Sequence, residues 1–175
     1  TVDFYWRTKN YAPAIAVLLQ ASKDAYPELS KQFVFEAARK STDAGQYAQA
    51  QELLAALLKT SPYDGQYLAA MAETYAQAGD DRGLRQFYLD KIALFRTAPF
   101  SGDERKARIA TLRRGLVPAL TRMKDYAGAI DQYVELISNC AEDAGLVNEA
   151  ALYALRYQRQ QQLLESYGQT GTQST

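Results

Sequence analysis

The residues that could perform chemistry in this chain are charged rather than nucleophilic or metal-binding. The sequence contains no histidine and a single cysteine, Cys140. A structural zinc site needs about four cysteine or histidine ligands, and a Ser-His-Asp or Cys-His pair needs histidine, so one chain can supply neither. Cys140 follows Ile137 at helical spacing, and we interpret it as a small buried residue rather than a reactive thiol. We therefore expect no metal and no other cofactor.

Carboxylates are the remaining candidates for acid–base catalysis. No two of them stand at a spacing typical of an acid–base pair, and helical faces rich in carboxylates are routine on globular proteins. We therefore expect this chain not to be an enzyme. The carboxylates considered are Glu36, Glu52, Glu73 and Asp131.

The segment 103–124 is basic, and it raises the question of an acidic partner or a nucleic acid. It holds seven basic side chains against Asp103 and Glu104, and it contains no aromatic residue that could stack on a base. We interpret it as a solvated helix face and expect no nucleic-acid partner. The basic residues are Arg105, Lys106, Arg108, Arg113, Arg114, Arg122 and Lys124.

Composition places few limits on the partner but several on the class of protein. The chain has 175 residues, 47% of them hydrophobic and 23% charged, and its 20 basic and 20 acidic residues cancel. A chain of this size buries about 70% of its unfolded surface. No apolar run approaches the ~20 residues that cross a bilayer, so we expect no membrane insertion. The chain opens abruptly on Thr1, and we interpret it as an internal piece of a longer protein, with no indication of its compartment.

A short sequence that occurs three times in the chain indicates where the helices and turns lie. The sequence 7–15 (RTKNYAPAI) returns as 122–130 (RMKDYAGAI), and 44–50 (AGQYAQA) is a third copy of its Tyr-Ala core. The clearest unit spans residues 31–64, where apolar residues at helical spacing form two stripes separated by Gly45. We expect Gly45 to end the first helix in a left-handed conformation, and Ser61 with Pro62 to begin the next. A second turn at Gly79 follows 34 residues later.

This period and pattern resemble the tetratricopeptide repeat family. The resemblance implies an all-α fold, a right-handed superhelical solenoid of antiparallel helix pairs that holds other proteins. The chain lacks the tryptophan that the family favours. The matching residues are Ala37, Ala38, Gly45, Tyr47, Ala50, Leu54, Leu57 and Pro62 in one unit, and Leu68, Met71, Ala72, Tyr75, Gly79 and Tyr88 in the next.

We expect one repeat domain over residues 1–167 and a disordered polar tail over 168–175. The third unit is overlong. Ser101 and Glu104 predict a capping box before a helix over 103–124, in which Pro118 should cause a bend and Gly115 should give it room. Its partner helix is 126–139, and two further helices are expected over 146–156 and 160–167. The domain comprises a partial unit 1–30, units 31–64, 65–102 and 103–143, and a weaker terminal unit 144–167.

The resemblance also implies where a partner binds, because this family uses the concave face formed by the first helix of each unit. Arginines there can pair with the carboxylates of a protein or peptide partner. Phe35 and Arg39 occupy the places where some relatives clamp a terminal carboxylate with Lys and Asn, so we do not expect that clamp. The residues mapped to the face are Phe35, Arg39, Asp43, Glu73, Gln77, Arg114, Arg122, Asn148 and Arg156.

The expected function is a non-catalytic protein–protein interaction scaffold or adaptor, as an internal section of a larger bacterial protein, with a peptide or a domain in its concave groove. Two alternatives stay open. The chain could be a homo-oligomeric assembly module that associates through exposed repeat ends, where Tyr5, Trp6 and Tyr11 form an aromatic cluster. It could also be the recruiting or regulatory arm of a catalytic domain elsewhere in the parent chain.

Overall fold

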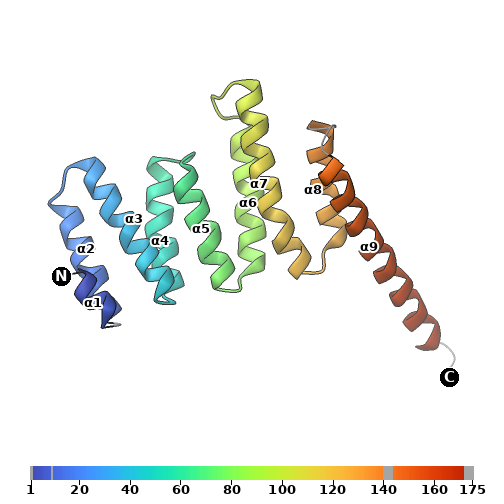
Figure 1. Ribbon diagram of the computed structural model, residues 1–175, viewed down its shortest axis with the longest axis horizontal. Helices are drawn as coiled ribbons and strands as arrows, with labels where there is room; N and C mark the ends of the chain where they lie inside the picture. The colour runs from blue at the N-terminus through green and yellow to red at the C-terminus, as the bar shows by residue number, and fades with distance from the viewer. Residues whose placement is uncertain (1, 9, 140–143, 172–175) are drawn as a thin grey trace. The chain divides into compact units, whose positions relative to one another are not determined.

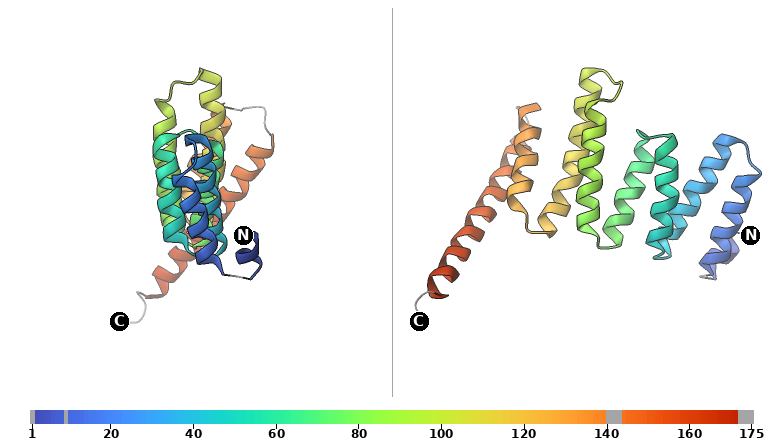
Figure 2. Two further views of the ribbon diagram at one scale, coloured as in Figure 1. Left: turned by 90° about the vertical axis from the view of Figure 1, so that its left-hand side faces the viewer. Right: turned by 180° about the vertical axis from the view of Figure 1, so that it is seen from behind.

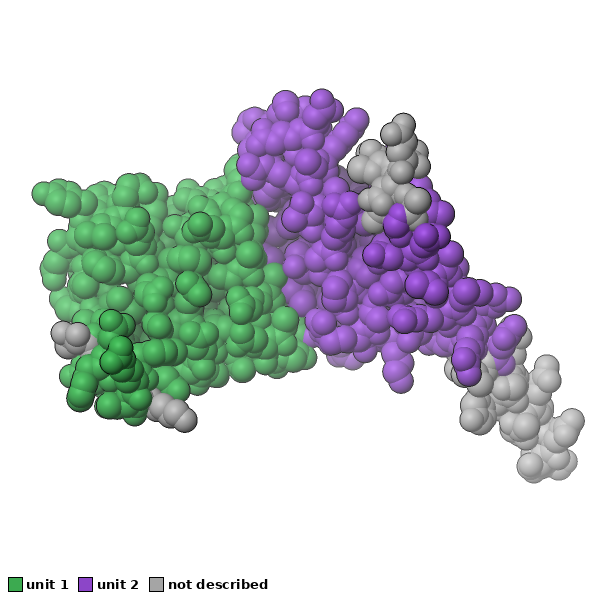
Figure 3. Space-filling model, viewed as in Figure 1, with its two compact units in different colours: residues 1–80 green, residues 81–175 purple. Residues whose placement is uncertain are grey.

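The computed structural model describes residues 2–8, 10–139 and 144–171, and within these ranges the regular structure is α-helical throughout. The chain divides into two compact units, residues 1–80 and 81–175, coloured separately in Figure 3. The all-α class is confirmed. The boundary between the units falls inside the expected repeat 65–102, between its two helices.

Unit 1 is a succession of helices in which each packs against the next, and α3 also contacts α5 (Figure 1). Its core is built mainly from small and aliphatic side chains, including Ala37, Ala38, Ala50 and Leu54, each with no exposed surface. Small residues let helix backbones approach closely, as the periodicity predicted. The helices are α1 (Val2–Arg7), α2 (Tyr11–Lys23), α3 (Pro27–Asp43), α4 (Tyr47–Thr60) and α5 (Gly65–Gln77).

The start of α5 corrects one expectation. Ser61 is the C-cap of α4, and α5 begins only after Asp64, whose carboxylate accepts hydrogen bonds from the amides of Gln66 (2.8 Å) and Tyr67 (3.2 Å). Aspartate is as good an N-cap as serine, so Ser61 and Pro62 lie in the loop instead. Helix α3, the first helix of the expected unit 31–64, also starts earlier than that unit does. It begins at Pro27, which lies in its first turn.

Three turns share one geometry, and two of them, at Gly45 and Lys124, lie within copies of the repeated sequence. Gly45, Gly79 and Lys124 have φ of 75°, 69° and 60°. In each turn the amide of the next residue donates to a carbonyl five positions back, with N–O distances of 2.8, 3.0 and 2.9 Å. This is the Schellman arrangement that ends α3, α5 and α7. The two glycine turns were predicted, and Lys124 adopts the same conformation despite its Cβ.

Unit 2 contains the long helix that the capping signal predicted, and consecutive helices again pack on one another (Figure 2). The Ser101 side chain accepts from the Glu104 amide (3.2 Å), but the Glu104 carboxylate pairs with Arg108 Nη2 (3.0 Å) as one half of an i,i+4 ion pair. The helices are α6 (Asp81–Arg96), α7 (Gly102–Arg122), α8 (Tyr126–Asn139) and α9 (Ala144–Gly171).

Helix α9 differs from the sequence expectation. Residues 144–171 form one continuous helix rather than two short ones, and the expected polar tail overlaps the last turn of this helix at 168–171 (Figure 2). No glycine or proline stands between 157 and 167 to break it, so a weak apolar pattern did not mean a boundary. Residues 172–175 and Cys140 lie outside the described residues. Within those residues, no helix combines the length and apolar character that a membrane span requires.

Candidate functional site

The candidate site is a cavity of about 580 Å³ in unit 2, enclosed by α7, α8 and α9. Its walls combine aliphatic and aromatic side chains with two arginines and one carboxylate. A cavity of several hundred Å³ with apolar walls and a few polar groups is typical of a binding site. The lining residues are Arg114, Val117, Pro118, Tyr133, Gly145, Glu149, Leu152, Tyr153 and Arg156.

Helix α7 supplies one wall of this cavity, and its position depends on close contact with α6. A Cβ on Gly115 would lie 2.6 Å from Tyr88 Cζ and 2.8 Å from Cε1, well inside van der Waals contact. Gly115 is therefore required for packing of the Tyr88 ring, a different reason from the bend room expected. Pro118 lies inside α7 and exposes its ring to the cavity, and the bend at Pro118 stays a prediction.

Two tyrosines, one on α8 and one on α9, join these two helices where they line the cavity. The Tyr133 hydroxyl donates to Glu149 Oε2 (2.7 Å), which ties α8 to α9, and the Tyr133 and Tyr153 rings stack with centroids 5.2 Å apart. Tyr153 Oη is also 2.9 Å from Thr121 Oγ1 on α7. Burial, and then the hydrogen bond to Glu149, raise the pKa of Tyr133 far above its ordinary value, so its hydroxyl stays protonated near neutrality.

The charge at this cavity is positive. Arg114 and Arg156 face a single carboxylate, Glu149, which already accepts from Tyr133. The Arg156 guanidinium lies 5.3 Å from the Tyr153 ring centroid, a cation–π arrangement that holds it against the wall. The arrangement suits an occupant with an apolar side chain and a carboxylate, because arginine binds carboxylates with paired hydrogen bonds.

Three arginines of unit 2 were predicted to lie on the partner-binding face. Two of them lie together at the cavity, and the third forms an ion pair outside it. Arg114 and Arg156 share the cavity, and Asn148 is exposed on α9 without lining it. Arg122 instead forms an ion pair with Asp81, with its Nε donating to Oδ1 at 2.7 Å, and so joins α7 to the start of α6.

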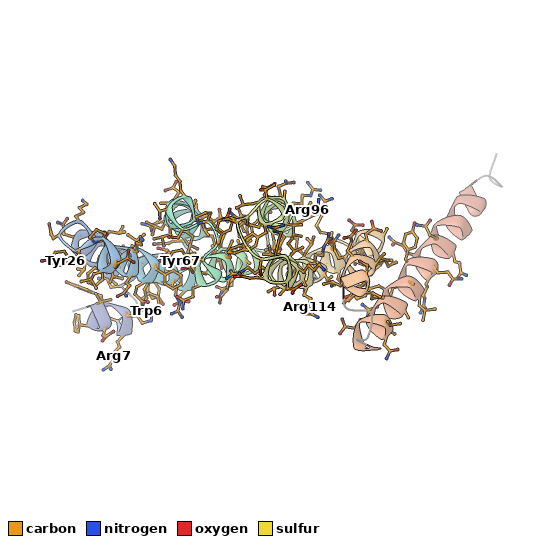
Figure 4. All side chains as sticks on the ribbon, turned by 90° about the horizontal axis from the view of Figure 1, so that it is seen from above. Trp6, Arg7, Tyr26, Tyr67, Arg96 and Arg114 are labelled. Atoms are coloured by element: carbon orange, nitrogen blue, oxygen red, sulfur yellow. The ribbon has the colours of Figure 1, made fainter. Side chains whose placement is uncertain are left out.

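The expected residues of unit 1 lie on α3 and α5. The Phe35 ring packs against Tyr67 with centroids 5.1 Å apart, which joins the two helices, and Tyr67 is labelled in Figure 4. Arg39 and Asp43 are exposed on α3. Glu73 and Gln77 are exposed on α5 and hydrogen bond to each other at 3.0 Å.

Arg113 is the residue that the sequence reasoning missed, and it corrects the solvated-face interpretation of 103–124. Its side chain is only 8% exposed; Nη1 donates to Gln132 (2.7 Å) and Nη2 to Glu135 (2.9 Å) on α8. Arg105 is also structural, donating to two carbonyls of the α6–α7 loop. The signal was present: Arg113 lies at i, i+3, i+4 and i+7 with three buried residues, Leu116, Val117 and Leu120.

The carboxylates considered as catalytic acids do not converge. Glu36 is 3.6 Å from Lys40 on its own helix, Glu52 is exposed on α4, Glu73 bonds Gln77, and Asp131 borders a different cavity between α6 and α8. In the part of the chain that the structure describes, no cluster of three or more His, Cys, Asp or Glu residues could hold a metal ion.

Comparison with known proteins adds no family. No protein-family profile matches the sequence, and no curated protein is significantly similar to it.

Proposed function

We propose that this chain is a non-catalytic, tetratricopeptide-like scaffold or adaptor that binds an acidic peptide segment or a partner domain in the cavity between α7, α8 and α9. The right-handed superhelical arrangement of its helix pairs is part of this proposal. It is supported by the shared turn geometry at Gly45, Gly79 and Lys124, which recurs after every second helix from α3 onward.

The observation that carries the proposal is that Arg114 and Arg156 line the same cavity, which also has apolar walls. Sequence reasoning mapped both residues to a partner-binding face, and they come from different helices, 42 positions apart in sequence. Around them lie Val117, Pro118 and Leu152, which suit an aliphatic or aromatic side chain. A partner with one apolar side chain beside one carboxylate could contact the apolar wall with the first and the arginines with the second.

The same cavity argues against catalysis. The only carboxylate among the described residues that line it, Glu149, accepts from the Tyr133 hydroxyl, and the second hydroxyl, Tyr153, accepts from Thr121. The raised pKa of Tyr133 removes it from proton transfer near pH 7. A catalytic acid–base pair needs two groups whose pKa values straddle the working pH.

The test is fluorescence anisotropy with labelled octapeptides that carry Leu or Phe flanked by Asp and Glu, and with matched peptides in which Lys replaces the acids. We expect the acidic peptides to bind, and Arg114→Gln and Arg156→Gln each to weaken binding by about 10- to 150-fold, since a charge-assisted hydrogen bond contributes about 1.5–3 kcal/mol.

Arg82→Gln is the matched control, because Arg82 is exposed on α6 in the same unit and lines none of the cavities described above. It should leave peptide affinity unchanged. Equal binding of acidic and basic peptides, or equal weakening by Arg82→Gln, would contradict the proposal.

Self-association is a second candidate function, and a specific observation favours it. Leu155 on α9 and Phe4 on α1 are 62% and 66% exposed, unusual for large apolar side chains. Size-exclusion chromatography with light scattering over a concentration series should then show a dimer that Leu155→Glu dissociates. A monomer at all concentrations would remove this candidate.

A further inference from the structure

A second, smaller cavity in unit 2 gathers positive charge around Arg113. It has a volume of about 140 Å³ and lies among the end of α6, the first half of α7 and α8. Lys106, Ile109, Ala110 and Arg113 follow one face of α7 at i, i+3, i+4 and i+7 and form its floor. Arg96 from α6 and Glu135 from α8 complete its lining.

One nitrogen of Arg113 has no hydrogen-bond partner. Its two terminal nitrogens bond Gln132 and Glu135, but Nε is buried and has no hydrogen-bond partner. The protein therefore satisfies the Arg113 guanidinium incompletely, although Nε itself has almost no surface exposed to the cavity.

The charges of the lining residues indicate the sign and the number of charges of a matching ligand. Three cations, Arg96, Lys106 and Arg113, surround one carboxylate, Glu135, which leaves a surplus of two positive charges. Arg113 takes the charge of Glu135, whereas no carboxylate of the described residues is within ion-pair distance of Arg96 or Lys106. Burial lowers the pKa of Arg113, Glu135 opposes this, and nearby Arg96 lowers it further, so the cluster is short of negative charge.

We propose that this cavity binds a small dianion of the phosphoryl type. A phosphoryl group carries about −1.5 to −2 charges at pH 7 and presents several strong acceptors, which matches the surplus of two positive charges that Arg96 and Lys106 provide. The cavity volume of about 140 Å³ is several times the ~10–15 Å³ that one water needs by the same measure, which is enough for a tetrahedral oxyanion with its waters.

This site is distinct from the proposed peptide cavity. Figure 4 shows Arg96 and Arg114 on opposite sides of the α6–α7 pair, and the two cavities share no lining residue. A third cavity, of about 450 Å³, adjoins the Arg113 site, but Asp131 there adds a second carboxylate and cancels the charge surplus. The dianion is therefore assigned to the smaller cavity.

The test is isothermal titration calorimetry of the whole chain with inorganic phosphate at constant ionic strength, with acetate as the monoanion. We expect saturable binding of phosphate that is at least about tenfold tighter than that of acetate. Arg96→Gln and Lys106→Gln should each weaken phosphate binding by about 5- to 20-fold, and both residues are exposed, so these variants should fold. Arg82→Gln, on the same helix as Arg96 and about 20 Å away along it, is the matched control and should bind as the wild type does.

A second arm distinguishes the source of the dianion. A phosphoserine peptide that binds at least about tenfold tighter than inorganic phosphate, while its unphosphorylated form does not bind, would identify a phosphorylated protein; equal affinities would identify the free anion. Absence of saturable phosphate binding up to about 10 mM, acetate binding as tight as phosphate, or equal weakening by Arg82→Gln would overturn the proposal. Arg114→Gln separates it from the peptide-binding proposal, because that change should reduce peptide binding and leave phosphate binding unchanged.

Discussion

The contact between α3 and α5 in unit 1 and the contact between α7 and α8 in unit 2 join helices by different chemistry. The first uses neutral groups: the hydroxyl oxygens of Thr42 and Thr74 are buried 2.8 Å apart, and the Phe35 and Tyr67 rings pack with their centroids 5.1 Å apart. The second uses a buried arginine, Arg113, which reaches a carboxylate on the next helix.

The difference teaches how a helical array acquires binding sites. Small neutral side chains pack closely and satisfy one another within the core. An arginine is long and has five donors, and Arg113 keeps one buried nitrogen without a hydrogen-bond partner. The three cavities described above all lie in unit 2, and two of them are lined by Arg113.

The largest losses of unfolding free energy should come from shortening a buried aliphatic side chain in unit 1 and from replacing the buried arginine in unit 2. Leu54→Ala in unit 1 removes a fully buried side chain and should cost about 2–5 kcal/mol of unfolding free energy. Arg113→Met should cost about 1–3 kcal/mol, less than a fully buried pair because Glu135 is half exposed. Urea denaturation followed by circular dichroism measures both, and the fluorescence of Trp6, the single tryptophan, reports unit 1 alone.

The control for Arg113 is its neighbour. Arg114→Met changes the same charge on an exposed side chain and should cost less than about 0.5 kcal/mol. If the two methionine variants were equally stable, the buried arginine would not be what joins α7 to α8, and the contrast between the units would fail.

Close approach of α6 and α7 gives the next largest effect. Gly115→Ala drives a Cβ into the Tyr88 ring and should cost about 1–3 kcal/mol. Gly65→Ala in unit 1 is the matched change, since a Cβ there meets nothing within 4 Å, and it should be neutral or stabilising. Thermal unfolding compares them, and a double-mutant cycle with Tyr88→Leu should show coupling between positions 88 and 115. An additive cycle would refute the packing explanation.

The shared turns offer a smaller comparison of opposite sign. Gly79→Ala forces a Cβ into the left-handed conformation and should cost about 1 kcal/mol. Lys124→Gly relieves the same strain in unit 2 and should stabilise by about 0.5 kcal/mol after the entropy of glycine in the unfolded chain is counted. Melting temperatures at one protein concentration should move in opposite directions, and movement in the same direction would mean that the turns are not equivalent.

Alkaline pH should affect unit 2 through Tyr133. Its folded pKa lies above its unfolded pKa, so its stabilising contribution is complete below about pH 10 and is lost as pH rises above that value. Tyr133→Phe should cost about 0.5–1.5 kcal/mol at pH 8 and should flatten the decline of stability between about pH 10 and 11. Urea denaturation at several pH values measures this, and an unchanged pH slope in the variant would assign the decline to other groups.

Local signals in the sequence determined most of the helices. Glycine at 45 and 79 and serine at 101 mark helix ends through their own backbone or hydroxyl, so the ends of α3 and α5 and the start of α7 were expected close to where they lie. These local signals gave the wrong helix boundary in two places. Ser61 and Asp64 are about equally good N-caps, and the start of α5 was assigned to the wrong one. Along α9 no glycine or proline separates the two helices that were expected, and they form one helix.

Tertiary structure alone decided what the charged residues do. The sequence placed Arg113, Arg114 and Arg122 on one basic helix and assigned Arg114 and Arg122 to the same binding face. In the structure Arg113 is buried against α8, Arg114 lines a cavity with Arg156, and Arg122 pairs with Asp81. Successive positions on a helix point about 100° apart, so the fate of each arginine depends on which helix packs on each side. That packing is a non-local property, whereas the helix ends depend on residues within a few positions of one another.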